Sequence, residues 1–176
     1  MTGPGYPLTL DLRGRRVVVV GGGAVGTRRA MALAEAGAMV EVVAPRLSGQ
    51  LAALAEQGQV VWRPRGYLAG DLTEPRRAWL VQAATDDPAV NAAVGAEAQA
   101  AGIWCVRADD VRASMAWTPA VVRGAEDTDA HGIVLAVTAD GDPGRSVAVR
   151  NALRDALHSG ALPVRRVRTR TREALR

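Results

Sequence analysis

The sequence predicts an α/β fold in which a doubly wound parallel sheet is followed by a small α+β dimerisation region. Near the N-terminus four consecutive valines lead into a glycine-rich turn and then into a helical pattern. Strand-like apolar runs and helical stretches then alternate as far as residue 106, interrupted by a loop at residues 63–74, as in a parallel sheet covered by helices. Beyond residue 110 two strand-like runs precede a single helix. The expected domains are residues 1–110 and 111–160, with a basic tail or linker at 161–176.

The first domain is expected to contain five central strands and three helices. Apolar, often β-branched runs predict the strands, at residues 16–20, 39–43, 60–62, 79–83 and 103–106. An alternating pattern at residues 8–12 predicts a brief edge strand. Apolar side chains at helical spacing predict helices at 24–36, 47–57 and 88–101, the last capped by Asp87 with Pro88 in its first turn. Such strand, helix, strand units cross over right-handed and make neighbouring strands parallel.

The second region is too small to bury a full core by itself. Residues 116–122 and 133–138 predict two strands joined by a polar loop, and a helix is expected to begin at Asp142-Pro143. A hairpin and one helix leave an apolar face without a partner inside the chain. We therefore expect a homodimer in which this face packs against a second copy.

Composition and charge argue against several classes of protein. The isoelectric point is 10.4, but six arginines after Pro163 account for the excess and leave the rest of the chain slightly acidic. That tail has no interleaved aromatic residues, so nucleic-acid binding is not expected. No apolar run approaches the roughly 20 residues of a membrane span, and no signal pattern is seen, so we expect a cytoplasmic protein. One cysteine and two histidines predict neither a disulfide nor a metal site.

Three glycines at the spacing G-x-G-x-x-G follow the first central strand. Gly21 suits a tight turn, Gly23 lets a pyrophosphate approach the backbone, and Gly26 lets the helix pack closely on the strand. The free N–H groups and the dipole of the following helix attract an anion. This predicts a Rossmann-like dinucleotide site outside the carboxyl ends of the strands.

Four stretches together resemble the precorrin-2 dehydrogenase module of siroheme synthases. They are residues 10–25, 35–38, 83–91 with the sequence Ala-Thr-Asp-Asp-Pro, and 119–122, and the likeness covers roughly residues 6–160. The resemblance implies a homodimeric enzyme that oxidises precorrin-2 to sirohydrochlorin with NAD, with the second region helping to form the tetrapyrrole cleft. Some members also insert iron into the product, and in multifunctional members the module is fused to a methyltransferase domain.

The resemblance also implies roles for individual residues. An aspartate just beyond the fifth strand is associated with dehydrogenation and chelation, which corresponds to Asp109 here. A carboxylate at a strand end is also well placed to accept a proton, and we favour Asp109 over its neighbour Asp110. The cofactor-binding residues expected from the resemblance and from the strand ends are Gly21, Gly23, Ala24, Val25, Gly26, Pro45, Arg46, Thr85 and Asp86. Helix capping is an alternative role for Thr85 and Asp86.

Cofactor choice and substrate contacts are less sharply specified. The second strand ends in Ala44, where an NAD-binding protein usually has an acidic residue, and Arg46 would suit the 2′-phosphate of NADP. The resemblance favours NAD, which is our prediction. A polycarboxylate substrate needs arginines; the candidates, each alternatively a solvated surface charge, are Arg107, Arg112, Arg145 and Arg150.

The chain departs from the family pattern at three places. Val106 stands where asparagine is common, residues 138–142 replace a serine-rich turn with paired glycines, and the arginine tail replaces a long helical segment. These departures concern iron insertion more than oxidation. They also leave an alternative open, in which the chain is a non-catalytic regulatory module that binds NAD or a tetrapyrrole.

Overall fold

The computed structural model describes residues 5–164. The chain forms two compact units, one up to Trp117 and one from Thr118 onward, and each is described by itself below. The arginines after Val164 in the predicted basic tail lie outside the described residues.

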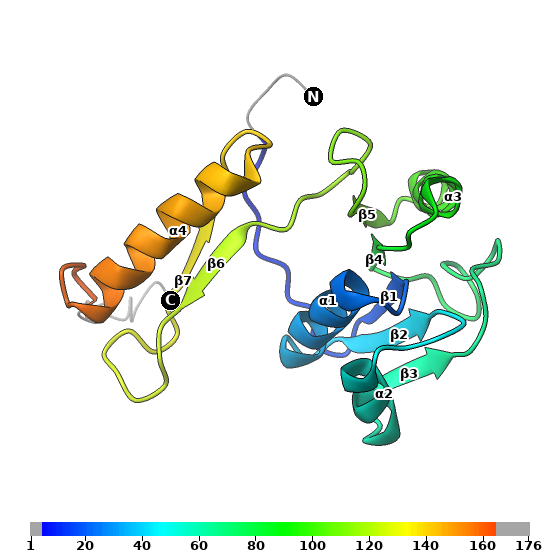
Figure 1. The fold of residues 1–176 in the computed structure, drawn as a ribbon, viewed down its shortest axis with the longest axis horizontal. Coiled ribbons are helices and arrows are strands. Elements are labelled where there is room, and N and C mark those ends of the chain that lie inside the picture. Colours follow the sequence, from blue (N-terminus) through cyan, green and yellow to red (C-terminus); the bar gives the residue numbers. More distant parts are fainter. Residues whose placement is uncertain (1–4, 165–176) are drawn as a thin grey trace, which may run out of the picture. The chain divides into compact units, whose positions relative to one another are not determined.

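The first unit is built on a five-stranded parallel sheet (Figure 1). Its strands are β1 (Arg16–Val20), β2 (Met39–Val43), β3 (Val60–Arg63), β4 (Leu80–Ala83) and β5 (Trp104–Arg107). They are arranged in the order β3-β2-β1-β4-β5. At the centre, Val20 lies between Val43 of β2 and Ala83 of β4. The predicted doubly wound fold is confirmed.

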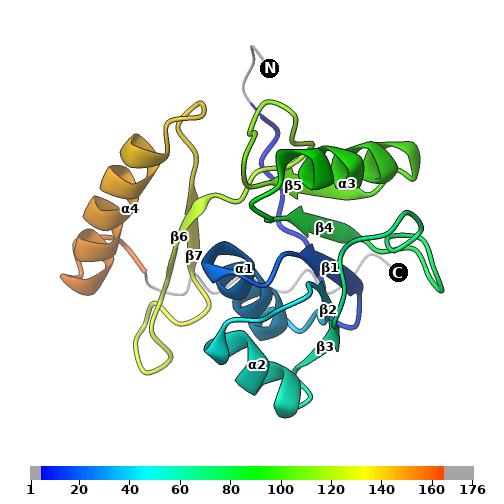
Figure 2. The same cartoon turned by 45° about the vertical axis from the view of Figure 1, so that its right-hand side comes forward.

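Helices cover both faces of this sheet (Figure 2). They are α1 (Ala24–Glu35), α2 (Gly49–Glu56) and α3 (Pro88–Ala100). Val17 and Val19 of β1 pack in one cluster with side chains of α1 and α2, whereas Val18 and Val20 pack in a second cluster with side chains of α3. The unbroken valine run is explained by this arrangement, because β1 is buried on both faces.

The predicted edge strand at residues 8–12 is wrong, because these residues form no strand. The carboxylate of Asp11 accepts the backbone N–H of Arg13 at 3.2 Å, and the N–H of Arg15 donates to the carbonyl of Leu12 at 2.9 Å. These bonds turn the chain just before β1, since aspartate side chains readily bond their own backbone two residues on. Leu12 is instead buried in the core cluster under α1.

The second unit contains an antiparallel pair and one helix. β6 (Ala120–Arg123) pairs with β7 (Val134–Val137), and α4 (Pro143–His158) begins at Asp142, whose side chain accepts the N–H of Arg145. The first of these strands is shorter than the predicted 116–122 at its N-terminal end. It begins only after Pro119, which has no N–H to donate to a ladder. None of the helices in residues 5–164 is long and apolar enough to cross a membrane.

A buried arginine holds the long segment between β3 and β4 in place. The guanidinium of Arg16 donates to the carbonyl of Arg76 at 2.7 Å, to that of Asp71 at 2.8 Å and to that of Leu72 at 3.3 Å. It also pairs with Glu41 at 3.1 Å. Residues 64–79 therefore wrap around a cation at the first position of the central strand.

Replacing this arginine by methionine is expected to lower the free energy of unfolding by about 3 kcal/mol, because three carbonyls lose their donor and Glu41 is left with the more exposed Arg63. Urea unfolding of Arg16→Met and wild type measures the loss. Arg13→Met, which removes an exposed pair with Asp11, is the matched control and should unfold like the wild type. Equal midpoints for all three proteins would contradict this role of Arg16.

Candidate functional site

Backbone hydrogen bonds bring the carboxyl ends of the central strands side by side. The N–H of Gly21 donates to the carbonyl of Val43 at 3.0 Å, and that of Ala84 donates to Val20 at 2.8 Å. The N–H of Ala108 donates to the carbonyl of Ala83 at 2.8 Å. The segments after β1, β4 and β5 are therefore adjacent. The strand order reverses between β1 and β4, which is where doubly wound sheets bind ligands.

The three motif glycines have different reasons to be glycine. A Cβ atom on Gly21, which has a φ of 119°, would lie 2.3 Å from the carbonyl oxygen of Ala84. A Cβ on Gly26 would lie 2.0 Å from the carbonyl oxygen of Gly21. A Cβ on Gly23 would meet nothing within 4 Å. Gly21 and Gly26 are thus required by packing, whereas Gly23 leaves the turn open for a ligand.

The turn contains one further packing glycine that sequence reasoning passed over. A Cβ on Gly22 would lie 2.1 Å from the carbonyl oxygen of Arg46, and the carbonyl of Gly22 accepts the N–H of Ser48 at 2.9 Å. This contact fixes the segment after β2 against the turn. The signal was present in the sequence as a third consecutive glycine.

The N-terminus of α1 has no side-chain cap. The other three helices in the described part of the chain have one: Ser48 caps α2, Asp87 caps α3 and Asp142 caps α4. The first-turn N–H groups of a helix need a partner, and an anion can supply it. Ala24 and Val25, in this first turn, are exposed. The open turn at Gly23 and the uncapped helix together fit a pyrophosphate.

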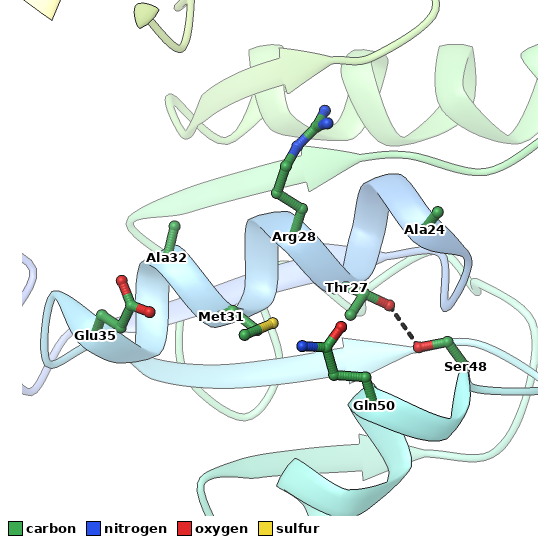
Figure 3. A pocket seen from close by; sticks show the side chains of 8 residues that line it. All are labelled: Ala24, Thr27, Arg28, Met31, Ala32, Glu35, Ser48 and Gln50. Atoms are coloured by element: carbon green, nitrogen blue, oxygen red, sulfur yellow. Dashed lines mark hydrogen bonds between the residues drawn. The ribbon is translucent and has the colours of Figure 1, made fainter. Parts of the chain in front are cut away.

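The segment after β2 lies against the glycine turn. Ala44 is buried and its carbonyl accepts the indole N–H of Trp62 at 2.8 Å, while Pro45 and Arg46 are exposed. The hydroxyls of Thr27 and Ser48 lie 2.7 Å apart and join α1 to the start of α2 (Figure 3).

A cavity of about 500 Å³ lies beside these two hydroxyls. Residues of α1 and of the start of α2 line it: Ala24, Thr27, Arg28, Met31, Ala32, Glu35, Ser48 and Gln50 (Figure 3). It follows α1 away from the strand ends rather than across them. The open turn at Gly23 and the uncapped N–H groups of α1 lie at the strand ends instead.

A buried asparagine holds the segment after β4. Asn91 is fully buried, and its Oδ1 accepts the backbone N–H of Thr85 at 3.1 Å and the Thr85 hydroxyl at 2.9 Å. Its Nδ2 donates to the carbonyl of Thr85 at 3.0 Å. The hydroxyl of Thr85 therefore faces the protein. Asp87 accepts the N–H of Ala89 at 2.8 Å as the cap of α3, and Asp86 is exposed.

Sequence reasoning gave Asn91 no role. The signal available was its position, because it shares the buried face of α3 with Val94 and Ala98. A polar side chain on such a face needs hydrogen-bond partners, and here the partner is the segment beside the glycine turn.

The two neighbouring carboxylates after β5 have different partners. Arg107 holds both oxygens of Asp109, with Nη2 at 2.7 Å from Oδ2 and Nε at 3.2 Å from Oδ1. This bond lowers the pKa of Asp109, against the opposing effect of partial burial, and Asn91 contributes to the lowering. Asp110 instead accepts the backbone N–H groups of Arg112 and Ala113. Asp109 is thus an ionised carboxylate just beyond the carboxyl end of β5, whereas Asp110 stabilises a turn.

The four candidate substrate arginines are not equivalent. Arg107 is already engaged by Asp109, and Arg112 is exposed in the turn after it. Arg145 and Arg150 belong to the second unit, where Arg150 donates to Asn151 at 3.0 Å. The thiol of Cys105 is buried, and burial raises its pKa to about 11. Within residues 5–164, no three His, Cys, Asp or Glu side chains are grouped as a metal site would require.

Comparison with known proteins identifies the family. A family model described as NAD(P)-binding matches residues 8–120. The chain belongs to this NAD(P)-binding family. The open turn at Gly23 and the uncapped N-terminus of α1 are features that a dinucleotide-binding protein needs. The predicted NAD(P)-binding character is therefore confirmed.

Several curated relatives of this NAD(P)-binding chain are siroheme synthases. That of Pseudomonas putida (strain W619) is 48% identical over 139 residues, which cover 77% of this chain and 27% of the relative. That of Chromobacterium violaceum is 38% identical over 88% of this chain and 31% of the relative. The chain thus spans about a quarter to a third of their length. Among solved structures, the precorrin-2 dehydrogenase SirC matches with a TM-score of 0.70 and 26% identity, over 89% of this chain and 75% of that chain.

Proposed function

We propose that the chain is a precorrin-2 dehydrogenase, which oxidises precorrin-2 to sirohydrochlorin with NAD in siroheme biosynthesis. The observation that carries this proposal is the position of an ionised carboxylate, Asp109. It follows β5, the open glycine turn follows β1, and β4 lies between these two strands. The siroheme synthases and the precorrin-2 dehydrogenase that the chain is similar to support this choice of substrate.

The residues that follow the carboxyl ends of β1, β2 and β4 would hold the cofactor. Gly21, Gly23 and Gly26 form the turn for the pyrophosphate, and the N–H groups of Ala24 and Val25 face its charge. Pro45 and Arg46 lie after β2, where the adenosine ribose is expected, and Thr85 and Asp86 form the neighbouring wall. When bound, NAD supplies the acceptor for the hydride that leaves the substrate carbon.

Asp109 would accept the proton that leaves the substrate together with the hydride. Its lowered pKa keeps it ionised, as a base must be, but also makes it a weak one. Asp110 is less suited, because its Oδ1 is taken by two backbone N–H groups. Asn91 would position the segment after β4 through its hydrogen bonds with Thr85.

The second unit would support a homodimer. Its core is small, comprising Val122, Ala130 and Leu157, and Val134, Val147 and Val149 are exposed. Burying such side chains against a second copy would add core that one chain lacks; sedimentation at several concentrations tests this. Iron insertion, fusion to a methyltransferase domain and a cytoplasmic location stay predictions.

One assay separates this function from its alternative. The protein is incubated with precorrin-2 and NAD, and NADH is followed by its absorbance. We expect NADH and sirohydrochlorin to form together, with a higher kcat/KM for NAD than for NADP. Binding of precorrin-2 without NADH would overturn the enzyme proposal and support a non-catalytic tetrapyrrole-binding module. A higher kcat/KM for NADP would instead assign Arg46 to a 2′-phosphate.

A further inference from the structure

The fold fixes the backbone of Arg107 but leaves its guanidinium held by Asp109. The backbone of Arg107 is fixed, because its N–H donates to the Ser114 hydroxyl at 2.9 Å and its carbonyl lies 3.3 Å from the same hydroxyl. Its side chain passes over α3 at Gly95, where an added Cβ would lie 3.4 Å from Cδ of Arg107. Within the described residues, the guanidinium donates to Asp109 alone.

The contrast with the buried arginine of β1 is informative. Arg16 donates to three carbonyls and pairs with Glu41, so its place is fixed by the fold. Among residues 5–164 the guanidinium of Arg107 has one partner, and 12% of the Arg107 side chain and 24% of that of Asp109 are exposed. A guanidinium with a single, partly exposed carboxylate partner can exchange it for another carboxylate.

The chemistry proposed for Asp109 requires such an exchange. Both of its oxygens accept hydrogen bonds from Arg107, and a carboxylate held in this way is a poor proton acceptor. The substrate itself brings carboxylates, which arginine binds in the same bidentate geometry. A substrate carboxylate is therefore a chemically equivalent partner for Arg107.

We propose that Arg107 changes its partner when the substrate binds. In the free protein it holds Asp109; in the complex it binds a carboxylate of the tetrapyrrole and releases Asp109 to accept the proton. This inference rests on the proposed dehydrogenase function. The other ionisable groups that act on the pair are Asp110 and Cys105, and α3 contributes the neutral Asn91. Cys105 stays protonated near neutral pH.

The pH dependence of the wild type tests the exchange without any substitution. Activity needs ionised Asp109, so the rate falls as the pH drops through the pKa of Asp109. The kcat/KM profile reports the free protein and the kcat profile reports the complex. Because Arg107 holds the pKa of Asp109 low only in the free protein, we expect the acid limb of kcat at higher pH than that of kcat/KM for precorrin-2. Coincident limbs would overturn the exchange.

Arg107→Gln supplies the second test. This substitution removes the guanidinium that lowers the pKa of Asp109 in the free protein. The acid limb of kcat/KM should therefore move to higher pH, toward that of kcat. The substitution also removes the contact with the substrate, so KM for precorrin-2 should rise about tenfold, while KM for NAD and kcat at neutral pH stay the same. A residue that only fixed Asp109 would lower kcat instead. Arg107→Lys keeps the positive charge, so its KM for precorrin-2 should lie between those of Arg107→Gln and the wild type.

The control is Arg154→Gln, which breaks an exposed pair with Asp155 in the second unit and should leave both profiles unchanged. Circular dichroism checks that each variant is folded. If a folded Arg107→Gln protein kept the wild-type KM for precorrin-2 and the wild-type acid limbs of both pH profiles, the inference would be overturned while the proposed function stands. Absence of NADH formation by the wild type would overturn the proposed function, and the inference with it.

Discussion

Asp109→Asn is expected to lower kcat for precorrin-2 oxidation by about 100-fold to 10,000-fold, the range typical for loss of a general base. Asparagine keeps the shape of the side chain but cannot accept the proton. The glycine turn and the segment held by Asn91 are untouched, so KM for NAD should not change. Steady-state kinetics with precorrin-2 and NAD varied in turn measure both effects.

Asp110→Asn is the matched control for this substitution. Asparagine retains an oxygen that can accept the N–H groups of Arg112 and Ala113, which Asp110 now accepts, so turnover should stay within a few-fold of the wild type. If Asp109→Asn instead kept wild-type turnover while Asp110→Asn lost it, the assignment of the two carboxylates would be reversed. Thermal unfolding of both variants excludes a loss of folded protein as the cause.

The fold could be predicted because its signals are local. The unbroken valine run predicts β1 and the Asp87-Pro88 pair predicts the start of α3, each from a few neighbouring residues, and the structure has both at those places. The strand predicted at residues 8–12 failed for a local reason as well. Its alternating apolar pattern is that of a strand, but Asp11 forms a turn with Arg13 that ends any extended pairing there.

The partners of the site residues depend on contacts that sequence spacing does not determine. Arg107 and Asp109 are two residues apart at the end of a strand, so a shared face could have been inferred, yet the arginine was assigned to the substrate. Asn91 and Arg16 are more difficult, since their partners come from a neighbouring loop and from residues 55 to 60 positions away. These polar contacts join separate elements, so they form only when the chain is folded.

Gly23→Val is expected to separate cofactor binding from folding. A Cβ atom at Gly23 would meet no protein atom within 4 Å, and the extended backbone there, with a φ of −77°, suits valine. The free energy of unfolding should therefore change by less than about 1 kcal/mol. The same side chain would occupy the approach of the pyrophosphate, so the Kd for NAD should rise about 100-fold. Calorimetric titration with NAD and urea unfolding measure the two quantities.

Gly26→Ala provides the comparison, because its added methyl group would lie 2.0 Å from the carbonyl oxygen of Gly21. That clash forces α1 away from β1 and should lower the free energy of unfolding by about 1 to 3 kcal/mol. Both variants then lose NAD affinity, but only Gly26→Ala loses stability. Wild-type affinity in Gly23→Val would place the pyrophosphate elsewhere and remove the glycine turn from the site, whereas loss of stability in both would mean that Gly23 is also a packing residue.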